Sequence, residues 1–292
     1  MRRARNFVLG VGGTMTLLTL LGGFFPASSS PALDATTSWL ATNWVFVHGA
    51  YGIVAILLLL SSPKPKSCDW MAMLLSAAYC SHQWEEHGWD ILGRRYSFVD
   101  HLAKLLSCEL TVESYFPRIR LMSSDCGFDE RTILYINTYA VMGLFLAPLI
   151  LPTNWRAYKR AMVIFNAMLV LVNALLFHLV PALVFQEYNP GLVQSVMVNA
   201  PLSFWVLRSL HQERHRGDRT LFALAFLING FPGQAVQALG PMVLARRGLI
   251  DGFQLHAIQA WTFLTLQPAL PFLLEVDQGK KKGKKIYTRK VK

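Results

Sequence analysis

The chain has 292 residues, of which 53% are apolar and 15% are charged, against about 25% charged residues in a typical soluble domain. The apolar residues lie in blocks of about 18–25, the length that crosses the hydrocarbon of a bilayer as a helix, and they lack the alternation of a membrane β-barrel. The formal net charge of +11 does not indicate nucleic acid, because the basic residues gather at the chain ends and in short loops without interleaved aromatic residues. Their expected contacts are anionic lipid head groups.

We predict an all-α fold, a polytopic transmembrane helical bundle of about eight spans. Three parts are expected: an N-terminal span and polar linker (1–40), a helical membrane domain (41–276) and a basic cytoplasmic tail (277–292). The predicted spans are residues 7–25, 41–61, 69–91, 133–151, 161–185, 192–210, 220–244 and 253–274.

The first apolar block, from Phe7 to Phe25, follows a basic start and precedes Pro26-Ala27-Ser28, a pattern that resembles a secretory signal. Its length favours a retained span; if it is cleaved, seven spans are left. Basic loops follow the second, fourth and sixth spans, and a lysine-rich segment follows the eighth, which predicts a cytoplasmic N-terminus.

The one long loop, residues 93–131, has a length typical of lids and binding segments. It contains Cys108 and Cys126, which can pair as a disulfide if the loop is lumenal or extracellular; the alternative is two free thiols that pack as small apolar side chains. The C-terminal residues Arg289-Lys290-Val291-Lys292 resemble a basic retrieval signal, which predicts the endoplasmic reticulum in a eukaryotic source.

The segment from Ser81 to His87 (SHQWEEH) puts two carboxylates and two imidazoles at the end of an apolar helix. On a helix, His82 precedes Glu85 by three residues and Glu86 by four, so the three side chains can share one face. Ionisable groups inside a bilayer cost about 2.5 kcal/mol or more, and they are usually kept for a function or paired. This segment is therefore the predicted functional site.

Other polar groups are predicted at the same depth. The fifth span carries Asn173 and, in its outer half, His178, and the turn after it reads Tyr188-Asn189-Pro190-Gly191. Gly230 and Pro232 are expected to break the seventh span, and Gln234 is a further pocket candidate because broken helices often border cavities. Such convergence at one depth is what a pocket requires.

Three of these elements together resemble a known family. They are an HxxEE pattern from His82 to Glu86, a second histidine, His178, behind an Asn-Ala pair, and a YxPG turn that ends at Gly191. In this order they resemble the HXXEE-motif family of integral membrane proteins. The resemblance implies a membrane protein with suspected enzymatic activity, and it supplies no reaction.

A His–Glu pair in apolar surroundings can hold one proton near neutral pH, which suits acid–base chemistry on an apolar substrate. We therefore predict an integral membrane enzyme of the isomerase, cyclase or hydratase type that acts on a lipid-like or other apolar small molecule. The predicted catalytic residues are His82, Glu85, Glu86 and His178, and the predicted substrate-binding residues are Trp84, His87, Asn173, Tyr188 and Gln234.

Other functions stay open from the residues alone. No cofactor is certain, but His82, Glu85, Glu86 and His178 offer nitrogen and oxygen ligands for zinc or iron, as in a metal-dependent membrane hydrolase or oxidase. The HExxH zinc pattern is absent from the sequence. The remaining alternatives are a proton-coupled transporter, which the lack of an internal repeat disfavours, and a non-catalytic membrane component.

Overall fold

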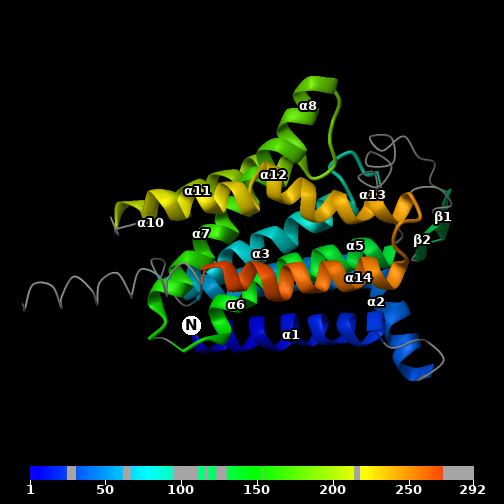
Figure 1. Ribbon diagram of the computed structural model, residues 1–292, viewed down its shortest axis with the longest axis horizontal. Coiled ribbons are helices and arrows are strands. Elements are labelled where there is room, and N and C mark those ends of the chain that lie inside the picture. Colours follow the sequence, from blue (N-terminus) through cyan, green and yellow to red (C-terminus); the bar gives the residue numbers. More distant parts are fainter. Residues whose placement is uncertain are drawn as a thin grey trace, which may run out of the picture.

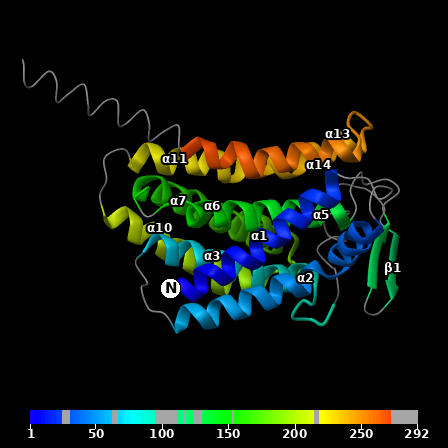
Figure 2. The same cartoon turned by 90° about the horizontal axis from the view of Figure 1, so that it is seen from below.

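The computed structural model describes residues 1–24, 31–61, 67–94, 111–115, 118–122, 130–152, 154–213 and 218–271. Its long helices run roughly along one direction and form a layered bundle (Figures 1 and 2). Helical segments of the described chain are named α, or η where they are π-helical. They are α1 (Arg2–Phe24), α2 (Pro31–Leu60), α3 (Cys68–His87), α5 (Glu130–Asn137), η2 (Thr138–Gly143), α6 (Leu144–Ile150), α7 (Arg156–Val172), η3 (Asn173–Leu179), α8 (Val180–Phe185), α9 (Leu192–Gln194), η4 (Ser195–Asn199), α10 (Ala200–Gln212), α11 (Asp218–Asn229), α12 (Phe231–Gln234), η5 (Ala235–Leu239), α13 (Gly240–Arg246), α14 (Gly252–Trp261) and η6 (Thr262–Leu266).

Four helical stretches in the described part of the chain are long and apolar enough to cross a membrane, fewer than the eight predicted. They are Arg2–Phe24, Asn43–Leu60, Arg156–Phe185 and Arg219–Arg246. The prediction of a helical protein with membrane-spanning character is therefore confirmed at this coarser level. Helix α3 is not among the four because His82, Gln83 and the two glutamates lower its hydropathy.

A β-hairpin departs from the all-α prediction. Strands β1 (Thr111–Tyr115) and β2 (Arg118–Met122) pair antiparallel, with Thr111 opposite Met122. The hairpin lies inside the loop predicted at 93–131, and the alternation of apolar and basic residues in β2 is the period-2 pattern of a strand. The all-α prediction thus holds for the bundle and not for this part of the loop.

Helix α3 lies at the centre of the bundle and positions the site. Its N-cap, Ser67, accepts a hydrogen bond from the backbone N–H of Trp70 at 3.2 Å, and the helix ends at Gly88. It packs against α2, α6, α7 and η4, and most of its side chains are buried, as expected of a helix that is surrounded by others. A hydrogen bond of 2.9 Å between Tyr51 Oη and Ser76 Oγ joins it to α2.

A buried ion pair fixes the start of α3 to α7. Lys159 Nζ lies 2.7 Å from Asp69 Oδ1, and the two side chains are 4% and 19% exposed. Asp69→Asn would leave a buried ammonium without its counter-charge, so we expect a loss of about 3 kcal/mol of stability, measured by thermal unfolding in detergent. Glu213→Gln is the matched control, since Glu213 lies 3.5 Å from Arg160 Nε and is 46% exposed. It should cost less than about 1 kcal/mol, and equal losses for both variants would contradict the prediction.

Five π-helical segments widen the helices of the described chain, and η3 packs against η4. Such segments are often found at functional sites. The seventh predicted span is interrupted at Gly230, between α11 and α12, as predicted from its Gly and Pro residues. Cys108 and Cys126, whose pairing the sequence leaves open, and the basic tail at 277–292 lie outside the described residues, whereas Cys68 and Cys80 are free thiols.

Candidate functional site

Helix α3 places His82 and Glu86 one turn apart on one face. His82 Nε2 lies 3.3 Å from Glu86 Oε2, and the two side chains are 0% and 5% exposed. Gln83, also buried, donates a hydrogen bond of 2.8 Å from Nε2 to the same Glu86 oxygen. The spacing of four residues on a helix accounts for the pairing.

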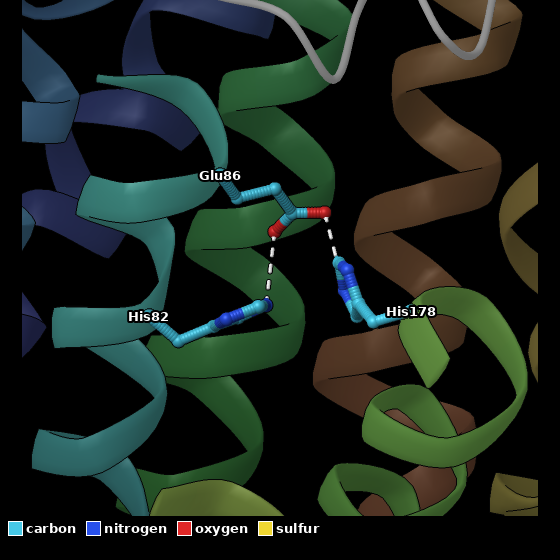
Figure 3. Close-up of side chains that lie close together, drawn as sticks. All are labelled: His82, Glu86 and His178. Carbon is cyan, nitrogen blue, oxygen red and sulfur yellow. Dashed lines mark ion pairs between the residues drawn. The ribbon is translucent and has the colours of Figure 1, made fainter. Parts of the chain in front are cut away.

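A second histidine reaches this pair from η3. His178 Nε2 lies 3.7 Å from Glu86 Oε1, and the rings of His82 and His178 meet edge to face with centroids 4.7 Å apart. Figure 3 shows the Glu86 carboxylate directed between the two imidazoles, which come from opposite helices. We call His82, Glu86 and His178 the central cluster. All three of these side chains are buried.

The turn after η3 fixes the orientation of His178. Its Nδ1 lies 2.9 Å from Asn189 Oδ1 and 2.8 Å from the carbonyl oxygen of Pro190. The Asn189 amide donates its own hydrogen bond to the carbonyl of Phe177, which assigns its oxygen to the histidine. Both neighbours of Nδ1 are acceptors, so Nδ1 carries the hydrogen. In the neutral ring Nε2 therefore presents its lone pair toward Glu86.

His82 is held on its far side by η4. Ser195 Oγ lies 3.4 Å from His82 Nδ1, and the Tyr79 ring packs edge to face on the imidazole with centroids 5.4 Å apart. A third imidazole approaches Glu86 along α3, since His87 Nε2 lies 3.6 Å from Glu86 Oε2. The carboxylate thus has three imidazole nitrogens within 3.7 Å. A positive charge placed among these nitrogens would stabilise the buried carboxylate.

Gly191, the last residue of the YxPG turn, closes against both histidines. Its φ is +80°, a left-handed conformation that glycine adopts without strain. A Cβ at this position would lie 2.6 Å from His82 Cε1 and 3.1 Å from His178 Cε1. The glycine is therefore required twice, by the turn and by the space that the imidazoles occupy.

Glu85 faces a different partner from Glu86. Its Oε1 accepts hydrogen bonds from Tyr188 Oη at 2.6 Å and from the backbone N–H of Val193 at 3.1 Å, and its Oε2 accepts from the N–H of Gln194 at 2.7 Å. Glu85 thereby caps α9, whose own N-cap residue, Gly191, has no side chain to do so. The structure separates Glu85 from the central cluster, in which the sequence had placed it.

Tyr188 is held at the rim of the site. The pKa of Tyr188 is raised above its ordinary value because burial disfavours the phenolate, and because the phenol donates to the Glu85 carboxylate. The Arg94 guanidinium lies 5.5 Å from the centroid of the Tyr188 ring, and it pairs with Asp90 at 2.9 Å. Tyr188 therefore links the turn to the end of α3.

Of the other predicted substrate-binding residues, His87 borders Glu86, whereas Trp84 and Gln234 contact other parts of the bundle. Trp84 packs edge to face against Phe46 of α2, and His87 lies against the ring of Trp44 with centroids 5.2 Å apart. Asn173 begins η3. Gln234 donates to the carbonyl oxygens of Leu169 in α7 and Asn229 at the helix break, at 2.7 and 2.6 Å, and so joins the break to α7. The structure thus gives Gln234 a structural role at this break.

Three residues of the site were missed by sequence reasoning. Gln83 and Asn189 occupy the unspecified x positions of HxxEE and YxPG, so the motifs give their place in the chain but not their residue type. Ser195 has no such signal, because a lone serine in an apolar stretch indicates nothing until η4 is seen to face His82.

Comparisons with known proteins bear on this same region. No curated protein and no solved structure matches the chain. Residues 73–206, which hold the central cluster and the YxPG turn, match the family described as "Protein of unknown function with HXXEE motif", and the resemblance drawn from the motifs is thereby confirmed for this segment.

Proposed function

We propose that the protein is an integral membrane enzyme that acts on a lipid-like or other apolar small molecule at the central cluster. The observation that carries this proposal is the Glu86 carboxylate, 5% exposed and surrounded by imidazole nitrogens from two helices. A carboxylate that is buried in this way is costly for folding, and such groups are typical of functional sites.

The membrane topology proposed here has eight spans and a cytoplasmic N-terminus. Each of the eight segments expected to cross the bilayer is mostly helical in its described residues, with a break at Gly230 in the seventh. The polar residues of α3 face the interior of the bundle rather than its surface, which supports a central position in the membrane domain. The endoplasmic reticulum is proposed as the compartment in a eukaryotic cell, on the basic C-terminal residues alone.

The reaction that we propose is an isomerisation, cyclisation or hydration that proceeds by proton transfer at the central cluster. Burial favours this chemistry because a site without bulk water strengthens electrostatic interactions and accepts an apolar substrate. Two features support a fixed geometry. The turn holds His178 through Nδ1, and Gln83 holds Glu86 through Oε2.

The experiment compares lipid extracts of a strain that lacks the gene with the same strain carrying variants of the full chain. Glu86→Gln keeps the size of the side chain and one acceptor oxygen, and it removes the charge. We expect the lipid profile of the gene-deficient strain to be restored by the wild type and not by Glu86→Gln, with equal amounts of both proteins in the membrane. Untargeted mass spectrometry also reveals which molecule accumulates.

Glu187→Gln is the matched control, because Glu187 is an exposed glutamate in the turn that follows α8. It should restore the profile as the wild type does. Full restoration by Glu86→Gln would overturn the proposal.

A further inference from the structure

The three side chains of the central cluster form a ligand set for a metal ion. His82, Glu86 and His178 each offer one ligand atom, and these atoms all lie within 4.8 Å of one another. Metal–ligand bonds of about 2.0–2.2 Å at a tetrahedral angle put neighbouring ligand atoms about 3.3–3.6 Å apart. His82 Nε2 lies 3.3 Å from Glu86 Oε2, and His178 Nε2 lies 3.7 Å from the other oxygen, Oε1, so each histidine is close to this spacing from the oxygen that it faces.

The same distances fit direct pairing less well. A charge-assisted hydrogen bond between nitrogen and a carboxylate oxygen is about 2.7–2.9 Å long. Both histidines are farther than this from Glu86, although Asn189 and Pro190 bind His178 at ordinary hydrogen-bond distances on its other side. The two imidazole nitrogens thus lie within ion-pair range of the carboxylate, at distances longer than a close hydrogen bond.

The groups behind the ligands are those that a metal centre requires. A histidine that binds a metal commonly donates its other ring N–H to a carbonyl or similar acceptor, which fixes the ring and its tautomer. His178 does so through Nδ1 to Asn189 and Pro190, and its Nε2 lone pair is directed at the cluster. Ser195 lies beside Nδ1 of His82, and Gln83 donates to Glu86 Oε2, the oxygen that faces His82.

We propose that His82, Glu86 and His178 bind one divalent first-row transition ion, zinc or ferrous iron, and leave at least one coordination position open. Two histidines and one carboxylate are a ligand set of catalytic zinc sites and of non-haem iron sites. The inference rests on the proposed function, since it assigns a cofactor to the same cluster. A metal held there would supply acid–base chemistry through a water at the open position, and Glu86 would serve as a ligand.

The test measures metal in the full chain, purified in detergent with a non-histidine tag and without chelators, once in air and once without oxygen. Elemental mass spectrometry should find close to one zinc or iron ion per chain. Glu86→Gln should lower this content at least about tenfold. His256→Gln should retain it, because His256 is a buried histidine that contacts Tyr139 elsewhere in the bundle. The element that copurifies, or that binds tighter on reconstitution, distinguishes zinc from iron.

A second measurement is independent of the variants. Wild-type protein loaded with Co²⁺ should show the visible ligand-field absorption of a low-symmetry nitrogen and oxygen site, and zinc should displace it. Wild-type protein that holds no metal after incubation with Zn²⁺ and Fe²⁺ overturns the inference, as does metal that Glu86→Gln retains in full.

The two proposals fail separately. If the wild type holds no metal and Glu86→Gln still abolishes function, the metal site is contradicted and the proposed enzyme is supported. If Glu86→Gln loses the metal but still restores the lipid profile, the proposed enzyme is contradicted and the metal site is supported.

Discussion

Gly191→Ala is expected to disable the central cluster while the bundle stays folded. The new Cβ would lie 2.6 Å from His82 Cε1, a distance that forces one or both imidazoles to move. A displacement of about 1 Å at a reactive centre can cost on the order of 100-fold in rate. We expect a loss of that size in the lipid-profile assay, together with loss of bound metal. Circular dichroism should show an unchanged helix content.

The chain offers a matched control for the backbone strain. Gly248 has a similar left-handed conformation, with φ +67°, but a Cβ there meets nothing within 4 Å. Gly248→Ala therefore imposes a similar backbone penalty, of about 1–2 kcal/mol, without moving an imidazole. This variant should retain function. Equal loss of function in both variants would attribute the effect to backbone strain and contradict the role given to Gly191.

Glu85→Ala is expected to have the largest effect on stability. Glu85 is 7% exposed and accepts three hydrogen bonds, from Tyr188, Val193 and Gln194. Hydrogen bonds to a charged group contribute about 1.5–3 kcal/mol each, so their joint loss, without full additivity, amounts to roughly 5 kcal/mol. The measurement is thermal unfolding in detergent, and amide hydrogen exchange should show the first turn of α9 opening.

Tyr188→Phe separates the parts of this effect. It removes one of the three donors and leaves the capping of α9 in place, so we expect a smaller loss, of about 2 kcal/mol. Glu85 is not one of the three proposed metal ligands. Glu85→Ala should therefore lower the metal content only through displacement of the YxPG turn, which orients His178. A Glu85→Ala protein as stable as the wild type would contradict the capping role.

Much of the site could be predicted from the sequence because helical periodicity and membrane topology act on long segments. The spacing of His82 and Glu86 fixed their shared face, and the parallel course of the third and fifth predicted spans brought His178 to the same depth. Both inferences need only the direction of each helix and the length of its apolar block.

The different partners of the two adjacent glutamates, Glu85 and Glu86, could not be predicted. Consecutive residues on a helix point about 100° apart, so one carboxylate had to face away from the other. The side that each one faces depends on which neighbour packs there. The sequence shows that Glu85 and Glu86 differ in direction, but only the packed turn shows that Glu85 meets Tyr188 and Glu86 meets the histidines.

Membrane spans were harder to count than to locate. Hydropathy found the helical segments, but the polar residues that serve the site lower the apolar character of α3. The hairpin of β1 and β2 was missed for a different reason. Strands of only five residues, of which β1 is mostly polar and β2 has two arginines, carry too little apolar pattern to stand out from a loop.

The π-helical segments η3 and η4 have a consequence for the ancestry of the site. A π turn is what a regular helix forms when one residue is inserted, and residues at its end are rotated by about 100° relative to an uninterrupted α-helix. His178 lies near the end of η3, so its direction toward Glu86 depends on that additional residue. A chain shorter by one residue in this span would present a different side chain to the carboxylate, and the site could thus arise or disappear through a single codon insertion or deletion.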